Sequence, residues 1–234
     1  AYTDGGLDPG PQPVAGWGVG LCLNPSGRYL RRLGSAIVPT GDQEVWEMWG
    51  RLDGEQNNSY AEAMALLQTL RFVHPDTPLE VYIDNYGVIQ QWHGLELNCS
   101  RDRAKRGARA IWNRIHALKG ERDRRGTDTV VRWVHSHVDD EDRRTRKKAP
   151  KVHKANDWWK PKPDPTPVGT GRSTSPMECA CGGDASGHCI QAHPHHIGND
   201  LADALAERGK ALDCAHSKVT KTRGTRVEVT HDGL

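Results

Sequence analysis

The chain has 234 residues, of which 35% are hydrophobic and 26% are charged, and its mean hydropathy is −0.74. The apolar residues are clustered, which predicts a folded core with polar insertions and excludes a chain that is disordered throughout. No apolar run reaches the roughly 18 residues that a membrane-spanning helix needs, so we expect no such helix in this sequence.

Basic residues are concentrated in two segments, although the formal net charge is only +2. Residues 100–126 hold ten Lys or Arg against three Asp or Glu, and residues 142–162 hold nine against two. Such segments suit a polyanionic partner, and a solvated helix face is the alternative for each. The six cysteines do not form the pattern of a secreted disulfide framework, which indicates a reducing compartment, nucleus or cytosol.

The N-terminal part predicts antiparallel strands. A first strand ends at Asp4, and alternating residues predict a second strand over 16–23. The turn residues 24–27 are followed by a predicted hairpin strand over 28–38 and by a further strand over 44–52.

Helices and strands then alternate. Apolar residues at helical spacing predict a helix over 59–73, and alternation predicts a short strand over 79–83. A short helix over 86–92, a basic helix over 101–119 and a strand rich in β-branched residues over 129–134 follow. This order predicts an α/β fold, with helices packed on a mixed sheet.

The last third of the chain has a different pattern. Residues 139–196 combine prolines and basic residues with almost no apolar periodicity, so we expect an insertion that is partly disordered. A helix is predicted to open at Gly198 and to end near Gly209. Residues 213–234 predict a polar, loose C-terminal tail.

Four acidic residues occupy comparable places in these elements. Asp4 and Asp84 end strands, and Glu62 and Asp203 lie in the first turns of predicted helices. Since crevices form outside the carboxyl ends of strands, the four carboxylates are expected to converge and to repel one another. Divalent cations offset that repulsion: oxygen ligands suit Mg²⁺, and two ions together activate a water and stabilise the leaving oxygen of a phosphodiester.

Each acid also has a purely structural alternative. Ser59-x-x-Glu62 has the spacing of a capping box, and Asp200-x-x-Asp203 has a similar form. Asp4 and Asp84 are also suitable turn residues. The joint pattern of four acids favours a functional site.

Five motifs in order resemble those of the ribonuclease H family. They are residues 2–6 with 16–18, 58–62, 82–85, 133–137 and 198–203. The resemblance implies an RNase H-like mixed five-stranded sheet, three antiparallel strands and then parallel ones, with helices on both faces. The catalytic domain would comprise residues 1–138 and 197–212, interrupted by the insertion 139–196 and followed by the tail 213–234.

The resemblance implies an endoribonuclease that cuts the RNA strand of RNA–DNA hybrids and leaves 5′-phosphate and 3′-hydroxyl ends. Asp4, Glu62, Asp84 and Asp203 would be the catalytic residues and would hold two Mg²⁺ ions, for which Mn²⁺ can substitute. His137 would assist proton transfer or product release. Because the insertion follows His137, His193, His195 and His196 are alternatives.

The resemblance also implies a nucleic-acid interface, with RNA minor-groove contacts near the first two motifs and DNA phosphates near the basic helix. The residues expected there are Gly5, Gly6, Asn58, Ser59, Asn85, Arg103, Lys105, Arg106, Arg109 and Trp112.

The last motif has the form Gly-Asn-x-x-Ala-Asp, and the sequence starts inside the first motif. In both features the sequence is most similar to RNase H domains of retroelement polyproteins. The partner would then be a covalently joined reverse transcriptase. The alternatives are a free-standing cellular ribonuclease H, a catalytically degenerate nucleic-acid-binding copy, and a transposase or integrase of the same superfamily. The last group usually lacks both the Glu on the first helix and the His loop.

The insertion holds a separate cluster of metal-binding residue types. Cys179, Cys181, Cys189 and His193 have a spacing compatible with structural zinc, although Cys-x-Cys is less usual than Cys-x₂-Cys. Free thiols in a flexible loop are the alternative.

Overall fold

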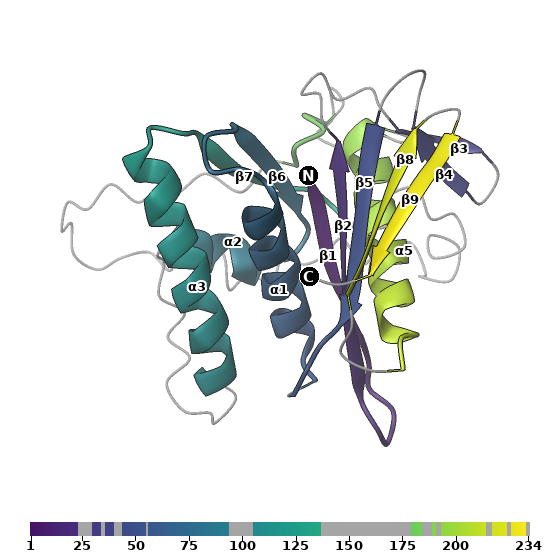
Figure 1. The fold of residues 1–234 in the computed structure, drawn as a ribbon, viewed down its shortest axis with the longest axis horizontal. Coiled ribbons are helices and arrows are strands. Elements are labelled where there is room, and N and C mark those ends of the chain that lie inside the picture. The colour runs from purple at the N-terminus through teal and green to yellow at the C-terminus, as the bar shows by residue number, and fades with distance from the viewer. Residues whose placement is uncertain are drawn as a thin grey trace.

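A mixed sheet with helices on both faces forms the centre of the computed structural model (Figure 1). The structure describes residues 1–22, 30–33, 36–39, 44–54, 56–93, 105–136, 179–183, 189–190, 193–213, 217–223 and 226–232. The central sheet has seven strands in the order β7-β6-β1-β2-β5-β8-β9. Their bounds are β1 Tyr2–Asp8, β2 Val14–Cys22, β5 Glu44–Arg51, β6 Leu79–Ile83, β7 Thr129–Trp133, β8 Ser217–Arg223 and β9 Arg226–Asp232.

The predicted fold class is confirmed. Strands β1, β2 and β5 pair antiparallel, and β6 and β7 continue the sheet in parallel from β1. The helices are α1 Asn58–Phe72, α2 Tyr86–Trp92, α3 Lys105–Arg124 and α5 Pro194–Lys210. In Figure 1, α1 and α3 lie on one side of the sheet and α5 lies on the other. None of the helices in the described part of the chain is long and apolar enough to cross a membrane.

Two features of the sheet differ from the sequence-based expectation. The predicted hairpin strand over 28–38 is instead a small separate hairpin, β3 Leu30–Leu33 with β4 Ala36–Pro39, and β5 takes its place beside β2. The expected loose tail contains β8, which pairs along β5 and places Val219 in the core. Strands β8 and β9 therefore extend the predicted five strands to seven.

Two glycines allow helices to approach the sheet on opposite faces. A Cβ at Gly5 would lie 2.3 Å from the backbone nitrogen of Glu62, and a Cβ at Gly18 would lie 2.3 Å from the carbonyl oxygen of Ala202. Helices α1 and α5 therefore pack directly against the backbones of β1 and β2. The glycine after Asp4 thus lets the backbone of α1 approach β1 closely.

The core fills the space between the sheet and these helices. On the α1 side, Leu66 and Leu70 pack with Val81 and Ile83 in one cluster of buried residues. On the α5 side, the leucines of α5 pack with aromatic residues of β1 and β6. Buried Arg122 holds the C-terminal end of α3 by donating to the carbonyl oxygens of His74 and Thr77 and to the hydroxyl of Thr129.

Candidate active site

The site lies where the parallel part of the sheet stops. Strands β1 and β6 pair only at Tyr2–Tyr82 and Thr3–Ile83, after which β6 ends and Asp84 follows. Strand β1 continues to Asp8, so Asp4 lies inside the strand and not at its end as predicted. Asp4 lies opposite Gly18 of the neighbouring strand β2, so the two residues face the same side of the sheet. Gly18 lies against α5, and the Asp4 side chain is therefore directed to the face that α5 covers.

The two helical acids lie in helix interiors and not in first turns. Helix α1 is capped by Asn57, whose side chain accepts from the Ser59 nitrogen, so the predicted Ser59-x-x-Glu62 capping box is wrong. Helix α5 begins at Pro194 with His193 as its cap, four residues before the predicted start, so Asp200 and Asp203 form no capping box either. The structural alternatives for Glu62 and Asp203 are thereby removed.

Three of the four carboxylates meet at one point. Oxygens of Asp4, Glu62 and Asp84 all lie within 4.8 Å of one another. Asp4 is 6% exposed and Glu62 is 3% exposed. Burial raises the pKa of Asp4 well above its usual range, and the neighbouring charges of Asp84 and Asp203 raise it further. Asp203 is therefore near enough for its charge to act on Asp4, and its role as a fourth ligand stays a prediction.

The pKa of Glu62 is also raised well above its usual range, first by burial and then by the charges of Asp4 and Asp84. In the described part of the chain, no Lys or Arg forms an ion pair with Asp4 or Glu62. Within the described residues, these two buried acids therefore have no Lys or Arg partner that would offset their charge.

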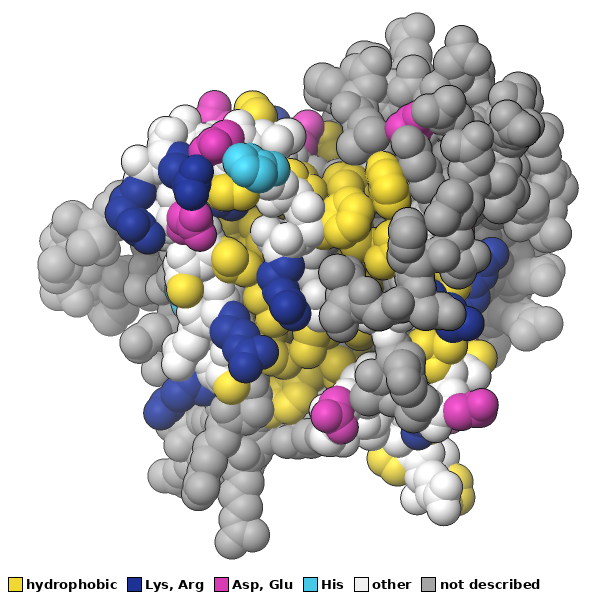
Figure 2. Space-filling view, in the orientation of Figure 1, with side chains coloured by type: hydrophobic (Ala, Val, Ile, Leu, Met, Phe, Trp, Pro, Cys, Tyr) yellow, Lys and Arg dark blue, Asp and Glu magenta, His cyan; other side chains and the backbone are white. Residues whose placement is uncertain are grey.

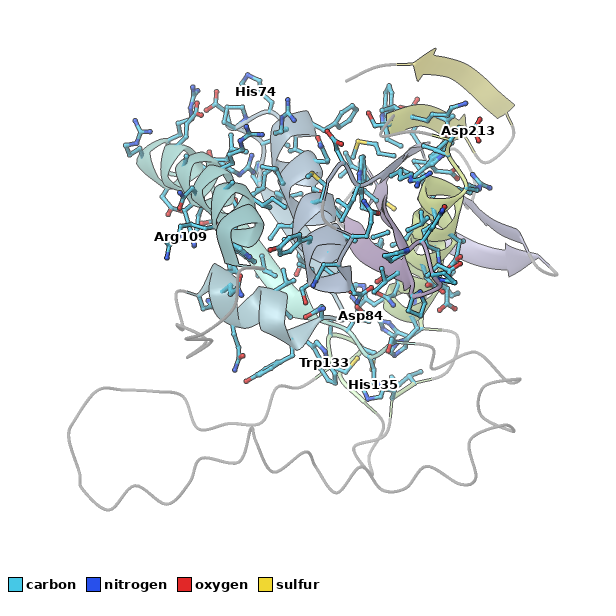
Figure 3. All side chains as sticks on the ribbon, turned by 90° about the horizontal axis from the view of Figure 1, so that it is seen from below. His74, Asp84, Arg109, Trp133, His135 and Asp213 are labelled. Carbon is cyan, nitrogen blue, oxygen red and sulfur yellow. The ribbon has the colours of Figure 1, made fainter. Side chains whose placement is uncertain are left out.

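Two amides hold the acids in place without neutralising them. Asn85 Nδ2 donates to Glu62 Oε1 over 3.4 Å, and Asn199 Nδ2 donates to Asp84 Oδ2 over 3.3 Å. Asp84 is labelled in Figure 3. Asn85 Oδ1 also caps α2 by accepting from the Val88 nitrogen. Sequence reasoning assigned Asn85 to nucleic acid and gave Asn199 no role, although Asn199 precedes Asp203 by four residues and so shares its helix face.

The residues fit a divalent cation. Glu62 Oε2 is buried and accepts no hydrogen bond from the described residues. A buried carboxylate oxygen without a donor is costly, and hard cations with oxygen ligands satisfy it. Asp4, Glu62 and Asp84 could therefore hold Mg²⁺, with Asp203 beside them.

The residues expected to bind nucleic acid divide into two groups. Asn58, Ser59 and Arg109 are exposed, whereas Gly5 is buried beneath α1 and Trp112 is 9% exposed within the core. The structure therefore gives Gly5 and Trp112 packing roles, and Gly6 lies beside Lys210 and Glu207.

The remaining basic candidates belong to the α3 side of the molecule. Figure 2 shows Lys and Arg side chains along this side. Arg103 lies outside the described residues, and Lys105 and Arg106 belong to the first turn of α3, whose side chains are not described. Their contacts with nucleic acid stay predictions.

The histidine expected at the site, His137, lies outside the described residues. Two of its alternatives have other contacts: the His195 ring stacks on Tyr82 at 4.0 Å between centroids, and His196 lies 3.9 Å from the sulfur of Cys179. The predicted zinc set also changes, because His196 and not His193 joins Cys179, Cys181 and Cys189. His193 Nδ1 instead accepts from the His195 backbone nitrogen as the cap of α5.

No protein-family model matches the sequence, and no curated protein matches it. Solved structures do resemble the chain. RNase H1 from the halophilic archaeon Halobacterium salinarum NRC-1 is 21% identical over 57% of this chain and 83% of its own, with a TM-score of 0.35.

Two further resemblances are of the same kind. The N-terminal RNase H domain of rv2228c from Mycobacterium tuberculosis is 19% identical over 57% of this chain and 78% of its own, with a TM-score of 0.35. LC11-RNase H1, solved in complex with an RNA/DNA hybrid, is 22% identical over 62% of this chain and 87% of its own, with a TM-score of 0.36.

Proposed function

We propose that the chain is a ribonuclease H-type endonuclease that hydrolyses the RNA strand of RNA–DNA hybrids in a divalent-metal-dependent reaction. The convergence of the Asp4, Glu62 and Asp84 oxygens within 4.8 Å, with Glu62 Oε2 buried and without a donor, carries this proposal. The order of the five motifs, from the glycines after Asp4 to the Asp203 helix, connects that cluster to hybrid hydrolysis.

The protein residues have separate tasks in this proposal. Asp4, Glu62, Asp84 and Asp203 would hold two metal ions, and the amides of Asn85 and Asn199 keep the carboxylates aligned. Bound metal supplies charge stabilisation at the phosphodiester and a water of lowered pKa. The exposed basic side chains of α3, with Arg109 among them, would bind backbone phosphates without reading base sequence.

A substrate panel tests this function. The full chain is incubated with a labelled RNA–DNA hybrid, a DNA duplex and an RNA duplex, each with Mg²⁺ and with EDTA. We expect internal cuts in the RNA strand of the hybrid, with 5′-phosphate and 3′-hydroxyl ends, only when Mg²⁺ is present. Binding of the hybrid without cleavage would instead identify a degenerate binding domain, and cleavage of the DNA duplex would indicate a nuclease of the transposase or integrase kind.

We also propose that the domain belongs to a retroelement polyprotein, on the form of the motif Gly198-Asn199-x-x-Ala202-Asp203. Sequencing the transcript upstream of Ala1 tests this proposal. A continuous reading frame that encodes a reverse transcriptase would support it, and an independent short cellular gene would contradict it.

A further inference from the structure

Three thiols and one imidazole converge where β7 ends and α5 begins. Cys179, Cys181, Cys189 and His196 each offer one ligand atom, and the four atoms all lie within 4.8 Å of one another. Cys181 and His196 are buried, and Cys179 and Cys189 are half-buried. Cys179 and His196 are far from β7 in sequence, yet both contact the backbone of His135, two residues after β7 ends.

The spacing suits a tetrahedral ion. Zinc with Zn–S near 2.3 Å and Zn–N near 2.0 Å places sulfur atoms about 3.8 Å apart and a sulfur and a nitrogen about 3.5 Å apart. Cys179 Sγ lies 3.9 Å from His196 Nε2. This pair therefore needs to contract by only a few tenths of an ångström, and the other ligand atoms lie at most 4.8 Å apart.

The orientation of His196 is fixed from its other nitrogen. His196 Nδ1 lies 3.0 Å from the carbonyl oxygen of His135, which can only accept, so Nδ1 carries the proton and donates. The lone pair on Nε2 is then directed at the thiols. Metal-binding histidines in proteins are held in this way by a backbone carbonyl.

Backbone amides are directed at two of the sulfurs. The His135 nitrogen donates to Cys179 Sγ over 3.3 Å, and the Gly183 nitrogen donates to Cys181 Sγ over 3.4 Å. Gly182 and Gly183 have φ values of 77° and 66°, a left-handed conformation that glycine adopts without strain. The Cys-Gly-Gly turn thus supplies an N–H donor that stabilises a thiolate.

The same segment is fastened to the sheet. The Ala180 nitrogen donates to the Trp133 carbonyl over 2.9 Å, at the end of β7. Figure 3 shows Trp133 and His135 at the end of the molecule where Asp84 lies, and the Trp133 indole donates to the Asp84 carbonyl over 3.0 Å. The cluster and the carboxylates are thus linked through one short stretch of β7 and its continuation.

We propose that Cys179, Cys181, Cys189 and His196 bind one structural Zn²⁺. The ion would hold the part of the insertion that contains the three cysteines against the end of β7 and the start of α5. Thiolate and imidazole ligands favour zinc over Mg²⁺, so this site and the carboxylate site select different metals. His195 does not belong to this group of ligand atoms, and its ring instead stacks on Tyr82 with Nδ1 3.0 Å from the Tyr2 hydroxyl.

The zinc site would also help to position residues of the nuclease site, a step that rests on the proposed function. His196 and Asp203 are seven residues apart on α5, which is about two helical turns, so both lie on one face of the helix. Fixing the first turn of α5 therefore positions Asn199 and Asp203 against the carboxylates of the sheet.

Metal content of the intact chain tests the proposal without any assay of activity. The protein is purified under reducing conditions, stripped with a chelator, dialysed with Zn²⁺ in the presence of excess Mg²⁺, and analysed for zinc by mass spectrometry. We expect one zinc per chain, and the same value for Asp4→Asn, since the carboxylate site is not involved. Cys181→Ser and His196→Gln should lose it, whereas the matched variants Cys22→Ser and His193→Gln should keep it.

Cobalt substitution keeps the proposal testable if His196→Gln or Cys181→Ser fails to fold. The wild-type chain loaded with Co²⁺ should show the intense visible absorption of a tetrahedral ion and thiolate-to-cobalt charge transfer. No stoichiometric zinc in the reduced wild-type chain, an octahedral cobalt spectrum, iron in place of zinc, or zinc absent from His193→Gln but kept by His196→Gln would each overturn it. If zinc binds and the hybrid is not cut, the zinc site stands and the nuclease proposal fails.

Discussion

Asp4 and Glu62 are buried acids beside other acids, an arrangement that costs the metal-free fold stability. Burial and neighbouring carboxylates raise the pKa of both. Between the ordinary carboxyl pKa and the raised one, the folded chain holds more protons than the unfolded chain. The stability of the metal-free protein therefore falls as pH rises through that window, and divalent metal should restore it.

Asp4→Asn tests this at the residue scale. Because the substitution removes one repelling charge, we expect the melting temperature of the metal-free protein at pH 7 to rise. The rise should be about 2–4 °C for each kcal/mol of repulsion relieved. The increase in melting temperature that Mg²⁺ gives the wild type should disappear. Differential scanning calorimetry with and without Mg²⁺ measures both effects.

Asp53→Asn is the matched control, since Asp53 is an exposed acid and is not one of the residues of the cluster. It should leave both the melting temperature and its Mg²⁺ response unchanged. A metal-free Asp4→Asn protein that melts lower than wild type, yet still responds fully to Mg²⁺, would contradict the charge-repulsion explanation.

Asn199→Ala tests the amide that sequence reasoning overlooked. Asn199 is 0% exposed and donates to the Asp84 carboxylate, so truncation removes this hydrogen bond and should cost about 1–3 kcal/mol. Urea unfolding measures this cost, and Mg²⁺ titration should show weaker binding. Asn113→Ala on the exposed face of α3 is the control, and equal destabilisation of the two variants would remove any special role of Asn199.

At this scale the acids were predictable and their surroundings were not. The strand alternation that ends at Asp84 and the spacing of the acids along the chain are local patterns, so they can be recognised in the sequence. Asn57 and Ser59 are both good caps, and the sequence does not show which one accepts the hydrogen bond. The amide contacts of Asn85 and Asn199 join residues far apart in sequence, so they depend on the tertiary fold.

The position of helix α5 as a whole depends on its direct contact with the sheet at Gly18. A Cβ at Gly18 would meet the Ala202 backbone at 2.3 Å, and that backbone is not free to move away as a flexible side chain would be. We expect Gly18→Ala to displace α5, to lower stability by about 1–3 kcal/mol or more, and to lower Mg²⁺ affinity.

The control substitution Gly120→Ala should change stability in the opposite direction. Gly120 lies in α3 with open space around it, so alanine should stabilise the helix by up to about 1 kcal/mol. Thermal unfolding compares the two variants. A neutral Gly18→Ala would mean that α5 is not seated on β2 as described.

Strand β8 gives a second prediction for an element. Ending the chain after Asp213 removes β8 and exposes the β5 edge together with the core position of Val219. Removing the buried Val219 alone should cost about 1.5–3 kcal/mol, and the free edge should promote aggregation. Ending the chain after Arg223 keeps β8 and should cost less; equal stability of both truncations and the full chain would support the loose tail.

Elements with strong local periodicity were predicted well, and the others were not. Helix α2 has its predicted bounds, and β6 has its predicted place. The segment 28–38 was mistaken for one long strand because alternation does not show which neighbour a strand pairs with. Strand β8 is mostly polar, with a single buried valine, so burial on β5 and not its own pattern determines it.

The whole molecule carries a net charge of only +2, so attraction to a polyanion must come from local charge. We expect replacement of Arg103, Lys105, Arg106 and Arg109 by Gln to weaken binding of every hybrid sequence. The slope of log affinity against log salt should flatten by about one unit or less for each phosphate that a replaced side chain had bound. Fluorescence anisotropy at several salt concentrations measures the slope.

A charge-preserving variant separates charge from shape in this prediction. Replacing the three arginines of the set by Lys should leave the salt slope unchanged, because counterion release depends on the charge. If the Gln variant also keeps the wild-type slope, this segment is an ordinary solvated face of α3.

The cleavage rate of an RNA–DNA hybrid by wild type, Asp4→Asn and Asp53→Asn, at saturating Mg²⁺, tests the central claim most directly. Wild type and Asp53→Asn should cut the RNA strand at equal rates. Asp4→Asn should be slower by about 10²-fold or more, since bound metal contributes several kcal/mol to catalysis. A folded Asp4→Asn protein that cuts at the wild-type rate would contradict the assignment of the carboxylate cluster as the active site.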